Sequence, residues 1–443
     1  MQPLPHPEHP RPDLQREPWC SLNGTWEFAA DENGLGLAQE WWRRPGLPGR
    51  IIVPYPVGSE LAGVKGAEGP RAVYWYLRRF DLPEALRNRC LCLHFGAADH
   101  HARVWLNDVL LGDHEGGYTP FSFDVTDIVR ACDNRLVVRV ADERSMRQVR
   151  GKQAWQANPS GIFYPGISGL WQTVWLEAVG PTRLSDLRLY PDLKGGCFHL
   201  RAAVERPEPA ALLDIHVTAP DGRWLPSTTL RVAGGRLAGP IAIARPQPWS
   251  PEAPNLYEFE MVLRTREGAE LDRVRTYGGL RDIAIEGDQI LLNGRPLYQR
   301  LVLVQGYFPG GVYTPASDGD WRRDVELVKA MGFNGLRMHQ KLEAPRFLYW
   351  CDRLGALVWA ELPSAYWPGR ESRRQIRQML PAVIARDANH PSIITWVLFN
   401  ESWGIHDLNW SAQARTEIVQ LVNQAHNLDA SRPIIDNSGF DHL

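Results

Sequence analysis

The chain has 443 residues, which exceeds one ordinary hydrophobic core and predicts roughly two to four domains. Its 49 basic and 51 acidic side chains leave a formal net charge of −2, so nothing points to nucleic acid or an anionic membrane as a partner. No apolar run reaches the roughly 18 residues of a membrane span, and the start, MQPLPHPEHPRPDLQRE, has no apolar segment typical of a signal peptide.

Residues 1–180 are predicted to form an antiparallel β domain, either a sandwich or a jelly roll, which begins with a Pro-rich arm over residues 1–18 that lies on the surface. Short strand-like runs follow one another and are separated by turn signals such as Asn107-Asp108 and Gly116-Gly117. This spacing is typical of a sandwich or jelly roll. The predicted strands include Ala72–Phe80, Arg89–Phe95, Arg103–Leu111 and Arg135–Ala141.

Residues 181–282 are also rich in strand-like runs but contain fewer aromatic side chains. Apolar and polar residues alternate along Asp214–Ala219 and Leu256–Arg264, as they do in strands with one buried face. About 100 residues of this kind predict an immunoglobulin-like β-sandwich.

Residues 283–443 alternate helical stripes with short apolar strands, the pattern of a parallel α/β sheet. One helix is predicted over Trp321–Met331, and another begins at Pro345 and ends at Gly355. Five strands are predicted: Leu297–Val304, Phe333–Met338, Ala356–Ala360, Ile393–Phe399 and Pro433–Asp436. A complete (β/α)8 TIM barrel takes about 250 residues. We therefore expect an incomplete TIM barrel, and a chain that is a fragment of a longer one.

The six cysteines contain no CxxC pair and no spacing typical of a metal site. Cys90 and Cys92 lie two residues apart in a strand-like run, so their side chains share one face and are poorly placed to bridge each other. We therefore expect reduced thiols, a cytoplasmic location and no bound metal. Four histidines fit no standard metal spacing either and are expected in exposed loops: His94, His100, His101 and His114.

Asn400 and Glu401 directly follow Ile393–Phe399, the longest apolar run of the third region. A run of β-branched and aromatic residues indicates a strand buried on both faces. The residues that follow such a strand lie at the carboxyl-terminal rim of a barrel, where barrel enzymes place their chemistry. Glu361 ends the preceding strand and is expected at the same rim.

Several stretches of the sequence resemble glycoside hydrolase family 2, the β-galactosidase and β-glucuronidase group. The resemblance covers nearly the whole chain and rests on six motifs: Arg103–Asp108, Gly116–Thr126, Ser168–Glu177, Trp249–Tyr257, Leu292–Leu297 and Asn389–Glu401. The motif Asn389–Glu401 is the most specific of the six. It implies a sugar-binding jelly roll, a sandwich and a catalytic barrel. It also implies a carbohydrate substrate and no organic cofactor.

By this resemblance, Glu401 is the general acid/base at the end of the fourth barrel strand, and Asn400 binds the sugar 2-hydroxyl. A retaining double displacement needs a second carboxylate about 5–5.5 Å away as the nucleophile. In the family this nucleophile follows the seventh strand, so we expect it beyond residue 443 and expect the 443-residue chain alone to be inactive.

The remaining candidates at the rim each keep two interpretations. Arg337 and His339 either bind the sugar and orient carboxylates or are packed structural residues, and Glu361 either binds substrate or supports Glu401. Trp403 is either a ring that stacks on a sugar or part of the core. Lys341 either contacts an acidic or polar group of the sugar or, as we expect, is a solvated surface lysine.

A second hypothesis is a non-catalytic carbohydrate-binding protein that uses the jelly-roll domain, and a third is an interaction scaffold built from β-sandwiches. The sequence leaves the sugar, the linkage and a homo-oligomeric state open.

Overall fold

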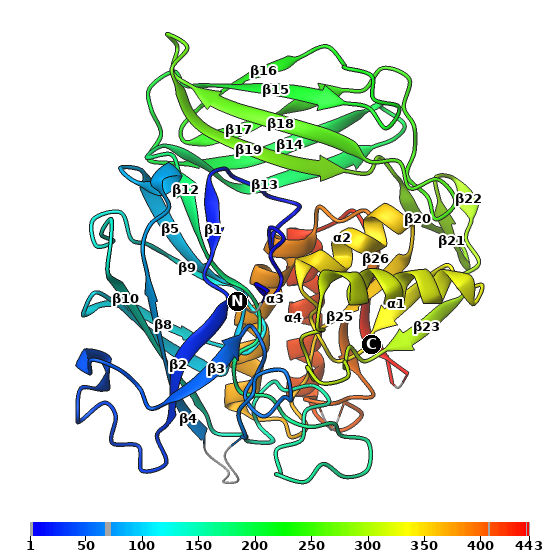
Figure 1. The fold of residues 1–443 in the computed structure, drawn as a ribbon. Helices are drawn as coiled ribbons and strands as arrows, with labels where there is room; N and C mark the ends of the chain where they lie inside the picture. The colour runs from blue at the N-terminus through cyan, green and yellow to red at the C-terminus, as the bar shows by residue number, and fades with distance from the viewer. Residues whose placement is uncertain (1–2, 67–71, 406–407, 440, 443) are drawn as a thin grey trace.

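The structure is a computed structural model that describes residues 3–66, 72–405, 408–439 and 441–442. Two antiparallel β-sandwiches lie beside a third region in which parallel strands alternate with helices (Figure 1). This arrangement confirms the predicted combination of two β-sandwiches with an incomplete barrel. None of the helices in the described part of the chain is long and apolar enough to cross a membrane.

The jelly roll packs a four-stranded sheet against a six-stranded sheet, with their shared core between them. The four-stranded sheet has the order β1 (Trp19–Ser21), β12 (Val174–Val179), β5 (Cys90–Phe95), β9 (Phe121–Asp124). The six-stranded sheet has the order β3 (Gly49–Val53), β2 (Gly24–Ala30), β4 (Ala72–Phe80), β10 (Asn134–Asp142), β7 (His101–Leu106), β8 (Val109–Glu115). Two short strands, β6 (Ala98–Asp99) and β11 (Gly169–Leu170), pair separately, and single 3-10 turns cover Trp41–Arg43 and Glu84–Leu86.

The prediction of one strand over Arg103–Leu111 is wrong. The structure has two strands there, β7 and β8, which pair antiparallel around Asn107 and Asp108. Both turn residues have positive φ, 51° and 70°, as a two-residue type I′ hairpin turn requires.

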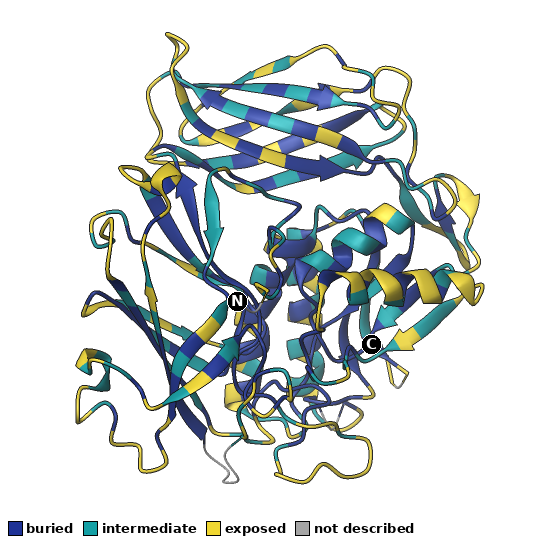
Figure 2. Ribbon diagram, in the orientation of Figure 1, coloured by how far each residue is buried: buried dark blue, intermediate teal, exposed yellow. Residues whose placement is uncertain are grey.

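The second sandwich also consists of two antiparallel sheets around a single core. One sheet has the order β13 (Arg183–Asp192), β14 (Cys197–Glu205), β17 (Arg236–Ala242), and the other β16 (Thr228–Arg231), β15 (Leu212–Thr218), β18 (Tyr257–Arg264), β19 (Glu270–Gly278). Buried and more exposed residues alternate along these strands (Figure 2), as the sequence predicts.

The third region begins with a small antiparallel sheet and continues as a five-stranded parallel sheet in sequential order. The small sheet contains β20 (Ile283–Glu286), β21 (Gln289–Leu292) and β22 (Arg295–Pro296). The parallel strands are β23 (Leu301–Val304), β24 (Gly335–Met338), β25 (Leu357–Glu361), β26 (Ile393–Asn400) and β27 (Ile434–Ser438). The helices are α1 (Asp318–Ala330), α2 (Pro345–Leu354), α3 (Arg370–Asp387) and α4 (Ala412–Leu428). All eight residues of β26 are buried, which confirms the prediction of a strand covered on both faces.

The N-terminal arm is not the surface segment that its composition suggests. Figure 1 places it between the two sandwiches and the helices. Arg16 is buried and pairs with Asp272 of the second sandwich (Nε–Oδ1 2.9 Å) and Glu177 of the jelly roll (Nη1–Oε1 3.2 Å). His6 contacts the barrel region, because its Nε2 lies 2.8 Å from the carbonyl oxygen of Pro315. The arm therefore fastens all three regions together.

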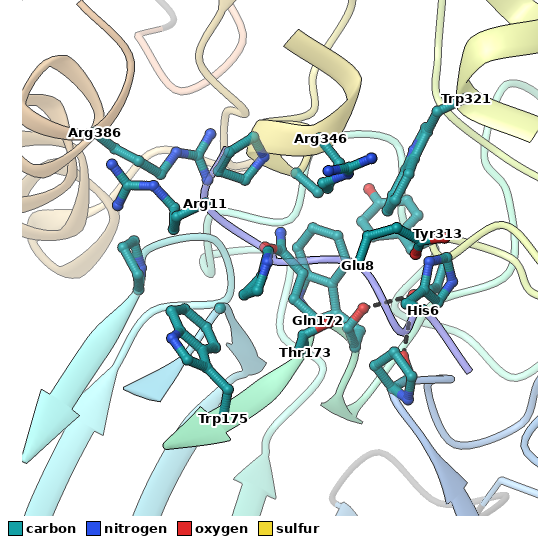
Figure 3. A pocket seen from close by; sticks show the side chains of 18 residues that line it. His6, Glu8, Arg11, Gln172, Thr173, Trp175, Tyr313, Trp321, Arg346 and Arg386 are labelled. Carbon is teal, nitrogen blue, oxygen red and sulfur yellow. Dashed lines mark hydrogen bonds between the residues drawn. The ribbon is translucent and has the colours of Figure 1, made fainter. Parts of the chain in front are cut away.

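A small cavity lies where the arm meets the jelly roll and the barrel region (Figure 3). Its lining includes His6, Arg11, Trp175 and Trp321. The cavity volume is about 30 Å³, which suits a water molecule and is far too small for a sugar. This cavity therefore does not hold the carbohydrate that the sequence leads us to expect.

Candidate functional site

Glu401 lies at the carboxyl end of β26, in a turn of unusual backbone conformation. Glu401 and Ser402 have φ of 48° and 60°, the left-handed region that costs a non-glycine residue of order 1 kcal/mol. The end of β27 holds this turn: Glu401 N–H donates to Ser438 O (3.0 Å), and Asn437 exchanges two hydrogen bonds with Ser402 (2.9 and 3.0 Å). Backbone strain of this kind is typical of functional positions.

The two residues predicted to carry the chemistry differ in exposure. Asn400 is buried, whereas Glu401 is exposed. The Glu401 carboxylate accepts no hydrogen bond from the described residues, so a solute can approach it. The pair thus combines a fixed amide with an accessible carboxylate.

Arg337 and Glu361 connect neighbouring strands beneath this pair. Arg337 donates from Nε and Nη2 to Glu361 Oε2 (2.8 and 2.6 Å) and from Nη2 to Asn400 Oδ1 (2.5 Å). Because the guanidinium occupies Oδ1, the amide orientation of Asn400 is set, and its Nδ2 has no partner among the described residues. Asn400 Nδ2 is therefore a buried N–H donor that lacks an acceptor in the described part of the chain.

Glu361 is fully buried, and both of its oxygens are engaged. Oε2 accepts from Arg337, and Oε1 accepts the backbone N–H of Gln340 (2.9 Å). His339 is also buried, with its Nδ1 3.1 Å from Glu361 Oε1 but without the geometry of a hydrogen bond. Of the two roles predicted for Glu361, this geometry favours support of the site over contact with substrate.

Trp403 is brought close to the site but has little free surface. It is 7% exposed, and Lys152 of the jelly-roll domain places Nζ 4.4 Å from the centre of its ring. Phe163 and Tyr366 also pack on it, with ring centres 5.7 and 5.2 Å away. The ring therefore serves first as part of an aromatic wall, which leaves less support for stacking on a sugar.

The expectation of a surface position for Lys341 is wrong. The side chain is 1% exposed and donates to the carbonyl oxygens of Gly306 (2.6 Å) and Tyr313 (3.0 Å) and to the carboxylate of Glu343. Charged side chains are buried in this way when their partners are fixed. Lys341 is thus a structural cation that ties the chain after β23 to the end of β24.

The four histidines of the jelly roll are not exposed loop residues. His94 and His114 lie in β5 and β8, and burial lowers the pKa of each to about 4. Within the described residues, the side chains that lie close enough together to bind a metal ion are elsewhere, in the β13–β14 hairpin. They are Asp192, Cys197 and His199, whose ligand atoms lie within 4.8 Å of one another.

The jelly-roll domain also contributes to the rim, which the sequence did not predict. The segment from Gly151 to Ile167 reaches the barrel region and carries Lys152, Trp155 and Phe163 against Tyr366 and Trp403. A signal was present in the sequence, because aromatic side chains interrupt an otherwise polar, Gly- and Pro-containing loop. Only the fold shows which surface they meet.

Family models match three consecutive stretches of the chain. The model for the sugar binding domain of glycosyl hydrolases family 2 matches residues 46–166. The model described as glycosyl hydrolases family 2 matches residues 182–281, and the TIM barrel domain of the family matches residues 283–441. These matches account for most of the chain, so it belongs to glycoside hydrolase family 2.

Individual relatives carry related names. A β-glucuronidase from Paenibacillus borealis is 25% identical over 96% of this chain and 74% of its own length. A β-galactosidase from Thermoanaerobacter pseudethanolicus is 29% identical over 83% of this chain and 48% of its own length. The solved structure of a β-glucuronidase from Ruminococcus gnavus in complex with D-glucuronic acid has a TM-score of 0.81 and 25% identity, covering 97% of this chain and 74% of that one. The chain thus spans about half to three quarters of the length of these relatives.

Proposed function

We propose that the chain supplies the first part of the active site of a retaining β-glycosidase, with Glu401 as the general acid/base. The observation that carries the proposal is the position of Asn400 and Glu401 at the end of β26, held by Arg337 and by the end of β27. Residues 1–180, 181–282 and 283–443 would act as sugar-binding-like, immunoglobulin-like and catalytic domains.

The proposed chemistry uses the carboxyl group of Glu401 first as a proton donor and then as a proton acceptor. In the first step, Glu401 donates a proton to the glycosidic oxygen while a carboxylate nucleophile attacks the anomeric carbon and the C–O bond breaks. In the second step, Glu401 takes a proton from water, which attacks the same carbon and releases the enzyme carboxylate. Two inversions retain the β configuration, and no organic cofactor takes part.

Glu361 is a poor candidate for the nucleophile, so we assign that role to no residue of this sequence. Its oxygens already accept hydrogen bonds from Arg337 and the backbone of Gln340, and the side chain is fully buried. We propose instead that Glu361 positions Arg337, and that Arg337 orients Asn400 so that its free Nδ2–H meets the sugar 2-hydroxyl. His339 would line the same rim.

The substrate class is taken from the names of the relatives. Because these include β-glucuronidases and β-galactosidases, we propose a β-linked glucuronide or galactoside as the carbohydrate substrate. The test is the leaving-group dependence of Glu401→Gln in the complete protein that contains this sequence. Phenyl glycosides need protonation of the leaving oxygen, whereas 2,4-dinitrophenyl glycosides do not.

The variant should therefore slow the first bond cleavage by about 100-fold or more for phenyl substrates and far less for dinitrophenyl substrates. Glu286→Gln removes an exposed carboxylate from β20 and should leave both rates unchanged. An equal loss for both leaving groups would refute the acid role. Sugar binding by the wild-type protein without any turnover would favour the non-catalytic carbohydrate-binding alternative.

A further inference from the structure

We propose that Lys152, a residue of the jelly-roll domain, binds substrate at the Glu401 site by donating a hydrogen bond to an oxygen of the sugar. The proposal rests on the proposed function for the location of the site. It adds a second domain to that site and names the chemistry that the domain contributes, a positively charged donor for a hydroxyl or carboxylate oxygen.

The backbone of Lys152 is fixed from both sides. Before it, the N–H of Gly151 donates to Ser364 O at 2.9 Å, and a Cβ at position 151 would lie only 2.0 Å from Gln340 O. After it, Gln153 is 1% exposed and donates from Nε2 to Asp99 Oδ2 (3.2 Å) within the jelly roll. The backbone of Lys152 is thus fixed at the point where the jelly-roll domain contacts the barrel region.

The two legs of the loop are also joined to each other. The N–H of Tyr164 donates to Lys152 O (2.9 Å), and the N–H of Ala154 donates to Tyr164 O (2.8 Å). Only the side chain of Lys152 is therefore left to adjust its position. A donor on such a fixed backbone loses little entropy when a ligand binds.

The Lys152 ammonium has an unusual lack of hydrogen-bond partners. The residue is 7% exposed, yet Nζ donates to no acceptor among the residues that the structure describes. By contrast, the other buried lysine, Lys341, has three acceptors. Most of the Lys152 side chain is buried, but its Nζ still reaches solvent beside the Trp403 ring. The three free N–H donors of Lys152 are therefore available to a ligand.

The Lys152 ammonium lies next to a residue of the proposed active site. Nζ lies 4.4 Å from the ring centre of Trp403, which stands two residues after Glu401. Burial lowers the pKa of Lys152, and attraction to Glu401 and Glu361 opposes that effect. Through this contact with Trp403, an oxygen bound by Lys152 would lie at the same rim as Glu401.

Aromatic side chains reinforce the same position. Trp155 stacks on Tyr366 (5.0 Å, 26°), and Phe163 packs between Tyr366 and Trp403 (5.4 and 5.7 Å). These rings come from the jelly-roll loop and from the chain after β25 and β26. An apolar wall limits competition from water and strengthens a charge-assisted hydrogen bond.

The experiment measures equilibrium binding and thermal stability of the complete protein, with turnover recorded separately. D-glucuronic acid and D-galactose are titrated into wild type, Lys152→Met, Lys152→Arg and Lys194→Met by calorimetry. Lys194 is an exposed lysine of the β13–β14 turn, so Lys194→Met removes the same charge far from the rim. Lys152→Met should weaken binding about 10- to 100-fold, Lys152→Arg should restore part of it, and Lys194→Met should bind as wild type does.

Thermal unfolding separates binding from a structural role. Lys152→Met keeps an apolar stem beside Trp403 and removes a charge that donates to no acceptor among the described residues, so its Tm should stay close to that of wild type. A structural lysine would show the reverse, a lower Tm with unchanged binding, and that result overturns the proposal. If Lys152→Met does not fold, Lys152→Gln replaces it, because weakened sugar affinity supports the proposal and unchanged affinity refutes it.

The two sugars identify the oxygen that is bound. A larger loss for D-glucuronic acid assigns a carboxylate to Lys152, and an equal loss for both sugars assigns a hydroxyl. Equal affinity of wild type and Lys152→Met, or no binding of either sugar to wild type, overturns the proposal. Binding that depends on Lys152 in a protein that hydrolyses no β-glycoside would leave Lys152 as a sugar-binding residue and refute only the proposed hydrolysis.

Discussion

Replacing Gly151 by alanine tests how the jelly-roll loop is docked onto the barrel region. Gly151 has a φ of +60°, and a Cβ there would lie 2.0 Å from Gln340 O. Gly161 in the same loop has a φ of +61° and open space around the position of a Cβ. The two alanine variants thus share the backbone strain of the left-handed region, about 1 kcal/mol, and differ only in the clash.

The clash determines the size of the expected difference. Non-bonded heavy atoms fit at about 3.5 Å, so the methyl group added by Gly151→Ala requires the loop to move by more than about 1 Å. This movement breaks the hydrogen bond from Gly151 N–H to Ser364 O, worth about 1 kcal/mol, and forced overpacking costs about 1–3 kcal/mol. Gly151→Ala should therefore destabilise the docked loop by about 2–4 kcal/mol more than Gly161→Ala does.

Hydrogen exchange of the amides of residues 151–167 measures this opening directly. Gly151→Ala should accelerate exchange across the loop by about 30-fold or more relative to Gly161→Ala, and it should also weaken sugar binding. Equal exchange rates in the two variants would refute the view that the close contact at position 151 docks the loop onto the barrel region.

Three further predictions concern the surrounding structure. Burial opposes ionisation of Glu177, but the neighbouring His9 ring and the charge of Arg16 outweigh it and lower its pKa from 4.5 to about 2. A carboxyl group whose pKa is lower in the folded state stabilises the fold above pH 4.5, and this stabilisation is lost as pH falls toward 2. Glu177→Gln should therefore reduce the free energy of unfolding by about 3 kcal/mol at pH 7 and make it depend less on pH between 4.5 and 2. Urea titrations that give the variant and wild type parallel pH profiles would contradict this. Glu361→Gln should lower kcat by about 10-fold or more, because Arg337 loses its acceptor and Asn400 its orientation, and unchanged steady-state kinetics would argue against that positioning role. The 443-residue chain alone should release no nitrophenol from a panel of nitrophenyl β-glycosides, and measurable turnover would overturn this expectation.

The elements that sequence predicts well are those defined by local chemistry. Pro345 and Gly355 delimit α2, with Gly355 in the left-handed conformation (φ 71°) that ends many helices. The apolar run before Asn400 becomes β26, because a strand between two others in a covered parallel sheet is buried on both faces. The rim position of Glu401 follows from the end of that strand.

The features that sequence did not predict depend on contacts between distant segments. The arm has the composition of a surface segment, yet its Arg16 is buried because it meets Asp272, 256 residues away. Lys152 and Lys341 look alike in the sequence, and only the fold shows that both are buried and that, among the described residues, Lys341 has acceptors whereas Lys152 has none. Side-chain pairing across domains carries no local periodicity, so pattern analysis cannot find it.

The most direct test of the central claim is the reaction of Glu401→Gly with azide. Glycine is favoured at the φ of 48° found at position 401, so this variant removes the carboxyl group without adding backbone strain. With a 2,4-dinitrophenyl β-glycoside, the glycosyl-enzyme forms without acid assistance, and azide then attacks the anomeric carbon and releases the enzyme carboxylate. If Glu401 is the acid/base, azide should restore turnover and proton NMR should identify a β-glycosyl azide. An α-glycosyl azide, or no response to azide, would contradict the assignment.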